Sequence, residues 1–166
     1  MVIAPRTNDY HPDHRYTGVL VQDAAFMVLV PMVIPQIPSL KRNPVFLYYE
    51  DNFQKPQPFH PDLAVDINDV WQRKLDAFEA NESQFYEAQP CWAGVSAEVP
   101  KDKVERRKWL EKRRDQRPTP AIRAALDKWY GPNRAKGIIR AEAFELCEYG
   151  RRPTDAEIRQ LFPFFE

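Results

Sequence analysis

The chain has 166 residues, 43% of them apolar and 13% aromatic, which suits one globular domain with a substantial core and excludes a disordered chain. Its 24 basic and 24 acidic residues balance, so net charge gives no argument for binding nucleic acid or an anionic membrane. Only five glycines are present, without a glycine-rich phosphate loop, and no Gly-x-Ser-x-Gly turn occurs. These absences argue against a nucleotide-binding enzyme and a serine hydrolase of that type.

The first informative stretch, residues 8–15, reads Asn-Asp-Tyr-His-Pro-Asp-His-Arg. Pro12 and Asp13 suit the first turn of a helix, because proline needs no N–H partner there and a carboxylate faces the positive end of the helix dipole. This places His11 at the helix start and His14 one turn in, on the same face. The imidazoles and the Asp13 carboxylate then reach one volume that suits a divalent metal. A catalytic zinc normally has three protein ligands, and this stretch offers two or three at most. The same residues therefore also fit a polar surface turn at a helix start, with Asp13 as a capping acid.

Residues 16–30 form the next run and are almost continuously apolar. Their apolar positions keep helical spacing on two neighbouring faces, which predicts a helix that is covered on most sides. Pro31, Pro35 and Pro38 end this run short of the roughly 20 apolar residues that a bilayer crossing needs. We therefore expect no membrane span, and a helix that packs on a sheet and holds His14 in place.

Two strands and a helix are predicted next. Residues 45–49 and 63–67 are short apolar runs, and both are typical of buried strands. Residues 51–61 form a proline-rich loop, and its part from Gln54 to His60 either lines a substrate cleft or is a solvent-exposed connection. We favour the second because its residues form no reactive constellation. Asn68 or Asp69 can cap a following helix, whose apolar face consists of Trp71, Leu75, Phe78 and Phe85. This order predicts part of an open α/β sheet.

The character of the chain changes after Pro90. Residues 101–117 hold nine basic and four acidic side chains, which indicates a solvated surface helix, and we expect no nucleic-acid binding because no aromatic platform accompanies the charge. We expect residues 1–90 to form an α/β domain and residues 91–166 to form a mostly helical extension that packs on the same domain.

The C-terminal part contains three predicted elements. A short amphipathic helix carries Ile122, Leu126 and Trp129 and ends near Gly131, and a closing strand lies within residues 137–149. Thr154 and Glu157 predict a capping box at the start of a last short helix. The phenylalanines near the chain end suggest a partner surface, such as another subunit; they are Phe162, Phe164 and Phe165.

The run His11–Gly18 resembles the second signature of the LmbE/PIG-L family of zinc-dependent N-deacetylases. Residues 65–67 and 80–85, with Lys74 before the second run, are similar to the family's segment in which a Val-Asp-Ile strand leads into a helix closed by Ala-His-x-Ser-Gln. Asn81 stands where the family usually has histidine. A final similarity, to the strand with which many members end, lies in Ala141-Glu142-Ala143-Phe144.

The resemblance implies a Rossmann-like open sheet and hydrolysis of the carbon–nitrogen amide bond in N-acetylglucosamine-type substrates. His14 would be a Zn²⁺ ligand. His11 would stabilise the oxyanion and protonate the leaving amine, and Asp13 would orient and charge-tune His11. This division suits the chemistry, because amide hydrolysis needs an acid for the departing nitrogen as well as a base for the attacking water.

Family members also open with an Ala-His-Pro-Asp-Asp motif, which supplies two zinc ligands and the general base, and this chain has no such motif. The other His-Pro-Asp, at residues 60–62, lies before a predicted strand and lacks the second acid. We therefore expect the fold class to be an incomplete Rossmann-like α/β sheet, the C-terminal part of the family fold, with a helical C-terminal extension. The chain alone is expected to have no deacetylase activity.

A second class of function is a non-catalytic remnant or interaction module that keeps part of the fold. The expected partners are a small N-acetyl sugar conjugate and either a missing N-terminal half or a second copy of the chain. Cys91 and Cys147 are too far apart for a CxxC-type metal clip, and a single pair is no disulfide framework. They suggest free thiols in a reducing compartment, and hence a cytoplasmic location.

Overall fold

The computed structural model describes residues 1–166 and confirms the α/β class. Its strands are β1 (Val2–Ala4), β2 (Phe46–Tyr49), β3 (Leu63–Asp66) and β4 (Ala141–Leu146). Its longer helices are α1 (Pro12–Met27), α2 (Trp71–Glu79), α4 (Lys103–Arg113), α5 (Pro120–Ala135) and α6 (Asp155–Leu161). Shorter helical turns are η1 (Asn68–Val70), η2 (Ser83–Ala88), α3 (Gln89–Trp92) and η3 (Ser96–Glu98). None of these helices combines the length and apolar character that crossing a membrane requires.

The four strands form one sheet in the order β1-β2-β4-β3. β1 and β2 are parallel, with Val2 opposite Phe46, whereas β2 and β4 are antiparallel, with Leu47 opposite Leu146. The predicted strands near residues 45–49, 63–67 and 137–149 are thus confirmed as β2, β3 and β4. β1 was not predicted, because three residues at a chain end carry too little alternation to indicate a strand.

The chain folds into two compact units. The first unit holds residues 1–65, 119–137 and 142–166, and the second holds residues 66–118 and 138–141. The predicted division fell at residue 90, whereas the chain after residue 118 returns to the unit that carries most of the sheet. Local sequence patterns do not predict that residues after 118 belong to the first unit, because this depends on which distant segments pack together.

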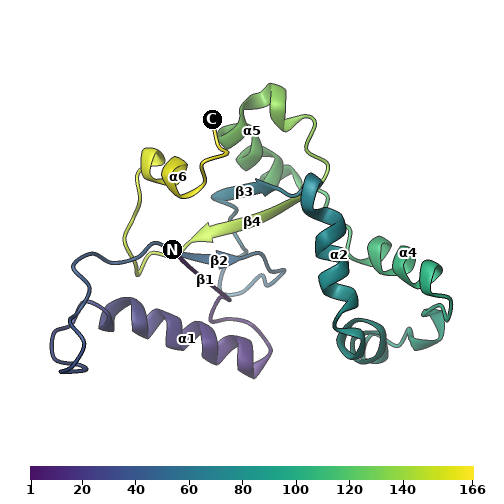
Figure 1. The fold of residues 1–166 in the computed structure, drawn as a ribbon, viewed down its shortest axis with the longest axis horizontal. Helices are drawn as coiled ribbons and strands as arrows, with labels where there is room; N and C mark the ends of the chain where they lie inside the picture. Colours follow the sequence, from purple (N-terminus) through teal and green to yellow (C-terminus); the bar gives the residue numbers. More distant parts are fainter. The chain divides into compact units, whose positions relative to one another are not determined.

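In the first unit, α1 lies beside the β1 and β2 strands, and α5 and α6 lie on the opposite side, near β3 (Figure 1). The buried residues that join α1 to the sheet are Ala25, Phe46 and Cys147. The prediction that residues 16–30 are covered on most sides is wrong. Leu20 and Phe26 are 67% and 72% exposed, and only Gly18 and Ala25 are buried in this helix.

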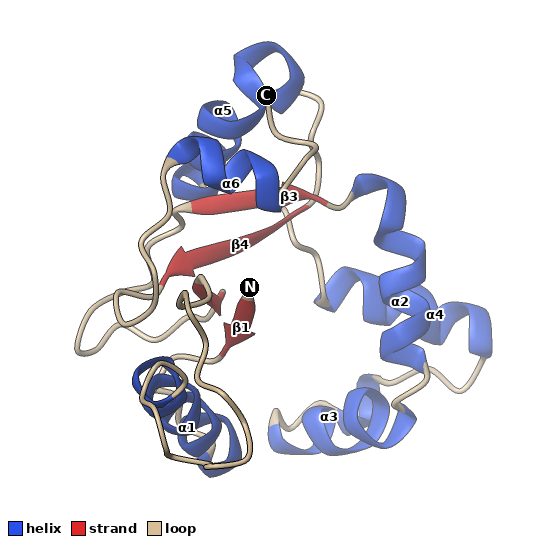
Figure 2. Ribbon diagram, turned by 60° about the vertical axis from the view of Figure 1, so that its left-hand side comes forward, coloured by secondary structure: helices blue, strands red, loops and turns tan.

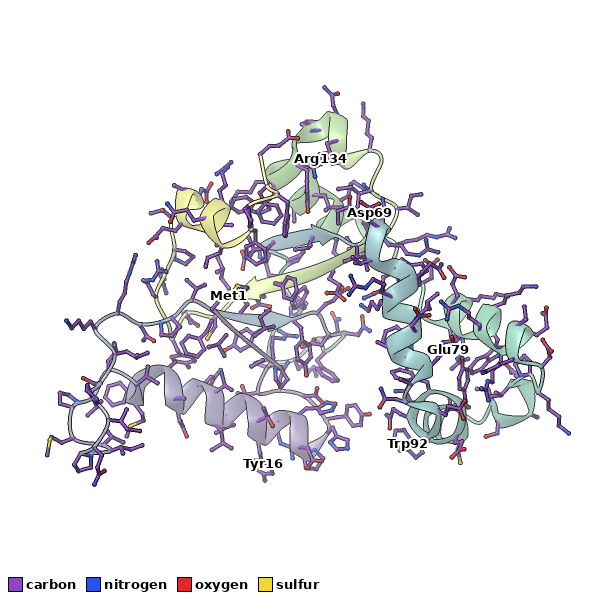
Figure 3. The ribbon with its side chains drawn as sticks, in the orientation of Figure 1. Met1, Tyr16, Asp69, Glu79, Trp92 and Arg134 are labelled. Atoms are coloured by element: carbon purple, nitrogen blue, oxygen red, sulfur yellow. The ribbon has the colours of Figure 1, made fainter.

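The exposure of α1 has a simple geometric cause. The small sheet covers one side of the helix, and no other layer of this unit covers the opposite side. Figure 3 shows Tyr16 on the side of α1 that faces away from the strands. The exposed apolar surface continues beyond the helix, through Met32, Val33, Ile34 and Ile37. An apolar surface of this extent is typical of an interaction site.

Gly18 allows α1 to approach the segment that follows β1. A Cβ atom at this position would lie 2.8 Å from the Pro5 carbonyl oxygen and 3.3 Å from the carbonyl carbon of Arg6. Both are backbone atoms, so relief requires a shift of the helix. Glycine is therefore needed here for close packing, although it is a weak helix former.

We expect Gly18→Ala to lower the free energy of unfolding by about 1–3 kcal/mol, because the overpacking outweighs the gain in helix propensity. Gly137→Ala is the matched control, since its added Cβ would meet Arg134 at an ordinary 3.6 Å. Urea denaturation of both variants measures the difference. Equal stability of the two would show that the approach of α1 does not depend on Gly18.

The C-terminal part of the first unit packs through aromatic rings. The predicted apolar face of α5 is confirmed, with Ile122, Leu126 and Trp129 buried. The predicted end near Gly131 is confirmed, because this residue has φ 71° and ψ 151°, outside the helical region; a second helical segment follows it and runs to Ala135 as the rest of α5. The capping box of Thr154 and Glu157 at α6 is also confirmed.

The phenylalanines at the chain end pack mainly within the chain. Phe165 stacks on Trp129 with ring centroids 5.1 Å apart, and it also meets Phe162 at 5.2 Å. Phe162 and Phe165 are buried, and Phe164 remains partly exposed. These residues were expected to pack against a partner such as another subunit, and α5 of the same chain provides most of that packing surface instead.

The second unit is built on α2 and α4, which lie side by side (Figure 2). The indole N–H of Trp71 donates to Glu111 Oε1 over 2.7 Å, and Arg140 Nη2 lies 3.1 Å from the same oxygen. The prediction that Asn68 or Asp69 caps α2 is wrong, because the N-cap residue is Val70 and no side chain caps it. The Oδ1 atom of Asn68 instead accepts from the backbone N–H groups of Ile139 and Arg140.

Candidate functional site

The start of α1 shapes the candidate site. His11 is the N-cap residue, with extended backbone angles of φ −78° and ψ 128°, and Pro12 opens the first turn. The backbone N–H of Asp13 donates to His11 Nδ1 over 3.3 Å, which satisfies one of the free N–H groups at the helix start. The predicted helix start is therefore confirmed.

Asp9 organises this turn, although the sequence did not single it out. Its carboxylate is buried; Oδ1 accepts from the backbone N–H of His11 over 2.8 Å, and Oδ2 lies 3.0 Å from His14 Nδ1. Arg15 donates to the Asp9 carbonyl oxygen over 3.0 Å. Asp9 thus holds both the loop backbone and the second imidazole. The local signal was an aspartate two residues before a helix N-cap, a position that favours a side-chain turn.

The two imidazoles lie together. Their ring centroids are 4.7 Å apart and their planes 30° apart, a stacked arrangement. The Asp13 carboxylate makes no hydrogen bond with either ring. Asp13 contacts His11 through its backbone N–H instead. The carboxylate that contacts an imidazole is that of Asp9.

When both rings are neutral, these contacts require opposite tautomers. A carboxylate only accepts, so His14 carries its proton on Nδ1 and keeps a lone pair on Nε2. A backbone N–H only donates, so His11 accepts at Nδ1 and carries its proton on Nε2. The site therefore presents an acceptor, His14 Nε2, and a donor, His11 Nε2–H, on neighbouring rings. The first could bind a metal ion, and the second could donate to a substrate beside it.

The pair fits zinc only in part. An imidazole held by a carboxylate through its other nitrogen is typical of zinc-bound histidine, so His14 fits the role of one ligand. No group of three or more His, Cys, Asp or Glu side chains in the chain is placed to hold a metal. These residues alone therefore do not fit a catalytic zinc, which needs three ligands and an open position.

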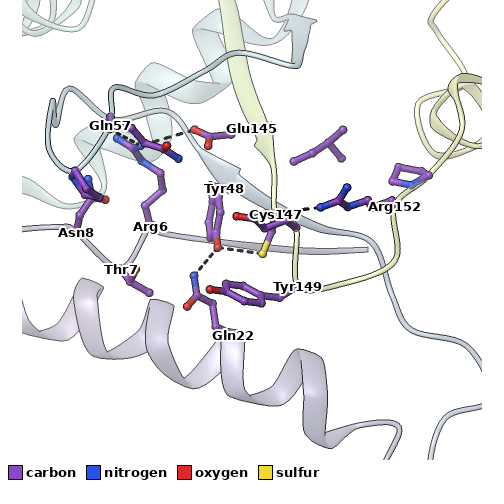
Figure 4. Close-up of a pocket in the computed structure, with 14 residues that line it drawn as sticks. Arg6, Thr7, Asn8, Gln22, Tyr48, Gln57, Glu145, Cys147, Tyr149 and Arg152 are labelled. Atoms are coloured by element: carbon purple, nitrogen blue, oxygen red, sulfur yellow. Dashed lines mark hydrogen bonds and ion pairs between the residues drawn. The ribbon is translucent and has the colours of Figure 1, made fainter.

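A cavity of about 610 Å³ lies in the same unit, beside the loop that leads to α1 (Figure 4). Arg6 forms part of its wall and is only 6% exposed. Its guanidinium donates to both carboxylate oxygens of Asp51 over 2.7 and 2.6 Å, and Nη1 donates to the Gln57 carbonyl over 3.0 Å. The hydrogen bond to Asp51 raises the pKa of Arg6, so the group stays charged despite burial.

The contacts of the loop at 51–61 bear on the two readings of its central part, a cleft lining or a solvent-exposed connection. Pro56 and Gln57 line the cavity, and Asn8 donates to the Lys55 carbonyl over 2.7 Å. The favoured reading, a solvent-exposed connection, holds for residues 54–58 and for His60, which are exposed, and the loop is in addition part of a cavity wall tied to the segment after β1. The ties come from residues about 45 to 50 positions away, which no local pattern reveals.

The lining of the cavity also includes a small polar cluster. Gln22 Nε2 donates to the Tyr48 hydroxyl over 2.6 Å, and the Cys147 thiol donates to the same oxygen over 3.0 Å (Figure 4). Burial, with a contribution from Cys147, raises the pKa of Tyr48, so its hydroxyl stays protonated. Cys147 is a buried free thiol and Cys91 an exposed one. Neither imidazole of the histidine pair lines this cavity.

No family model matches this chain. Among solved structures, it is similar to GalB, the 4-carboxy-2-hydroxymuconate hydratase from Pseudomonas putida KT2440, with a TM-score of 0.52 and 17% sequence identity. The match covers 93% of this chain and 54% of the hydratase chain, so the chain spans about half the length of that protein. At this identity the likeness concerns the fold alone, a mixed arrangement of strands and helices.

Proposed function

We propose that this chain carries the proton-donating side of a zinc-dependent N-deacetylase site, which hydrolyses the amide of N-acetylglucosamine-type substrates. The observation that supports it is the pair of stacked imidazoles, one of them held by the buried Asp9 carboxylate. The sequence run His11–Gly18, with its resemblance to the LmbE/PIG-L signature, supplies the reaction class. The proposed fold is correspondingly the C-terminal part of a Rossmann-like open sheet.

Each residue has a role that follows from its contacts. His11 presents an Nε2–H that hydrogen-bonds the amide oxygen as the oxyanion forms. It protonates the leaving nitrogen from its imidazolium form, in which Nδ1 is also protonated and no longer accepts from Asp13; the ring ends neutral, the C–N bond breaks, and acetate and a free amine leave. His14 would offer its Nε2 lone pair as one ligand to a zinc ion, and Asp9 positions that ring. Asp13, by its backbone N–H, positions His11. The base for the attacking water and the other ligands are assigned to residues outside this chain.

The exposed side of α1 supports a protein partner. Leu20 and Phe26 lie on a surface without a covering layer, and β1 pairs on one edge only. We propose that an N-terminal half of the same enzyme, or a second copy of the chain, covers this surface. Two free cysteines support a reducing compartment, such as the cytoplasm.

A non-catalytic interaction module is the second candidate. The observation that favours it is the absence of three grouped metal donors. In that case Asp9 and His14 serve only to anchor the start of α1. The two candidates differ in whether His11 and His14 affect any turnover.

The test begins with the purified chain, zinc and a panel of N-acetylglucosamine conjugates. We expect no acetate release, because the base and two ligands are lacking. Turnover that is lost in His14→Ala would contradict this expectation and would show that the chain holds a complete site.

The reading frame upstream of Met1 decides the next step. If it encodes a strand and an Ala-His-Pro-Asp-Asp motif, the longer protein is assayed, and His11→Ala and His14→Ala should each lower kcat/KM by roughly 100-fold or more. His60→Ala is the matched control, since its ring is exposed and pairs only with Asp62. An active longer protein that is indifferent to both changes, or a closed frame without the motif, would favour the interaction module.

A further inference from the structure

The second unit contains a cavity that the proposed deacetylase site does not use. It has a volume of about 410 Å³ and lies where η2, α3 and the end of α4 meet. Its lining combines aromatic and cationic side chains, chiefly Phe85, Trp92, Trp109, Arg113 and Arg114. Figure 3 labels Trp92 at the end of α3. Cavities of this size accommodate small organic ligands.

Arg114 is a cation without an anionic partner. It lies over the rings of Phe85 and Phe78, at 4.8 and 5.8 Å from their centroids, and it forms no ion pair. Burial lowers the pKa of this guanidinium, and neighbouring Arg113 lowers it further. The same helix shows the contrast, because Arg107 pairs with Asp76 over 2.8 Å and also with Glu79.

The side-chain nitrogen atoms of Arg114 are accessible to solvent. The buried side-chain nitrogens of this unit that lack a partner belong to Arg106 and Arg140. The nitrogens of Arg114 are therefore reached by solvent, and Arg114 itself lines the cavity. A partly buried cation that lines a cavity and has no partner for its donors in the chain is stabilised by an anion bound beside it.

The aromatic side chains indicate what accompanies the charge. Trp92 and Trp109 both line the cavity, and Trp92 is 65% exposed. The Arg113 guanidinium carbon lies 5.0 Å from the centroid of the Trp109 ring. Exposed indole faces bind planar rings by stacking. Arg113 likewise has no carboxylate partner, so two arginines without ion pairs line one aromatic cavity.

We propose that this cavity binds a small anion with a planar aromatic ring, the anionic group on Arg113 and Arg114 and the ring against Trp92. The anionic group is a carboxylate or a phosphate ester, which guanidinium groups bind in the same way. This site is independent of the deacetylase proposal, because none of its residues belongs to the histidine pair or to the first unit.

The experiment titrates the unmodified chain with four probes and follows tryptophan fluorescence and heat of binding. The probes are 1-naphthoate, 1-naphthyl phosphate, neutral 1-naphthamide and inorganic phosphate. We expect at least one naphthyl anion to bind about tenfold or more tightly than both the amide and inorganic phosphate, and more weakly at high salt. The tighter of the two anions identifies the carboxylate or the phosphate ester as the ligand group.

Variants then place the ligand in the cavity. Arg114→Met keeps an apolar side chain over the phenylalanine rings and should weaken the anion by about tenfold, whereas Lys112→Met, an exposed neighbour on α4, should not. Trp92→Ala removes the exposed ring and decides the matter if Arg114→Met fails to fold. Equal binding of naphthoate, naphthyl phosphate and naphthamide, or full binding by a folded Arg114→Met or by Trp92→Ala, would overturn the proposal.

Discussion

Replacement of Arg6 by methionine is expected to lower the free energy of unfolding by about 3–5 kcal/mol, because it removes a buried cation and leaves two mostly buried carboxylates without it. Asp51 loses a two-bond contact with the guanidinium, and Glu145, whose oxygen lies 3.8 Å from Arg6 Nη1, loses its ion pair. The carbonyl groups of Phe53 and Gln57 lose their donors as well. The cavity wall at residues 51–61 should therefore become accessible to proteases.

Arg42→Met is the matched control for this change. Arg42 is 67% exposed and pairs with Glu157 at the surface, so its removal should cost less than about 1 kcal/mol. Urea denaturation followed by tryptophan fluorescence, with limited proteolysis of the loop, gives the comparison. Adding Asp51→Asn to Arg6→Met should recover part of the loss. If Arg6→Met and Arg42→Met were equally stable, Arg6 would not hold the cavity wall.

Trp129→Ala is the second change with a large expected effect, a loss of about 3–5 kcal/mol in the free energy of unfolding. The indole is buried, stacks on Phe165, and donates from Nε1 to the Asp62 carbonyl over 2.8 Å. Truncation to alanine opens a cavity between α5 and the chain end and also removes this hydrogen bond.

Trp129→Phe separates the two contributions, because it keeps a ring and removes the donor. We expect it to cost about 1–3 kcal/mol, the usual range for a buried acceptor left without its partner. Trp92→Ala controls for loss of an indole as such, since Trp92 is largely exposed. Thermal and urea unfolding measure all three variants. If Trp129→Phe were as damaging as Trp129→Ala, ring packing would contribute nothing to stability.

Local signals explain which parts of the fold were predictable. Pro12 and Asp13 fixed the start of α1, the Thr154–Glu157 pair fixed the start of α6, and short apolar runs indicated β2 and β3. Each of these features depends on residues within one or two turns of each other. The stacking of His11 on His14 is of the same kind, since their spacing puts them on one face.

Features that depend on distant contacts were not predictable. Arg6 contacts a loop about 45 to 50 residues away, and nothing near it in the sequence indicates a buried cation. The exposure of Leu20 and Phe26 depends on what else packs on the sheet, which periodicity does not report. Asp9 lay within the stretch that drew attention, but the choice of Asp9 over Asp13 as the partner of an imidazole follows from the turn geometry.

Nitrogen NMR of the imidazole rings tests most directly whether Asp9 and the helix start give His11 and His14 their opposite roles. Under alkaline conditions, where imidazole is neutral, His14 should carry its proton on Nδ1 and His11 on Nε2. Asp9→Asn should remove the preference of His14 and leave that of His11. If His14 carried its proton on Nε2 in the unmodified chain, it would offer no lone pair there, and the assignment of His14 as a metal ligand held by Asp9 would be contradicted.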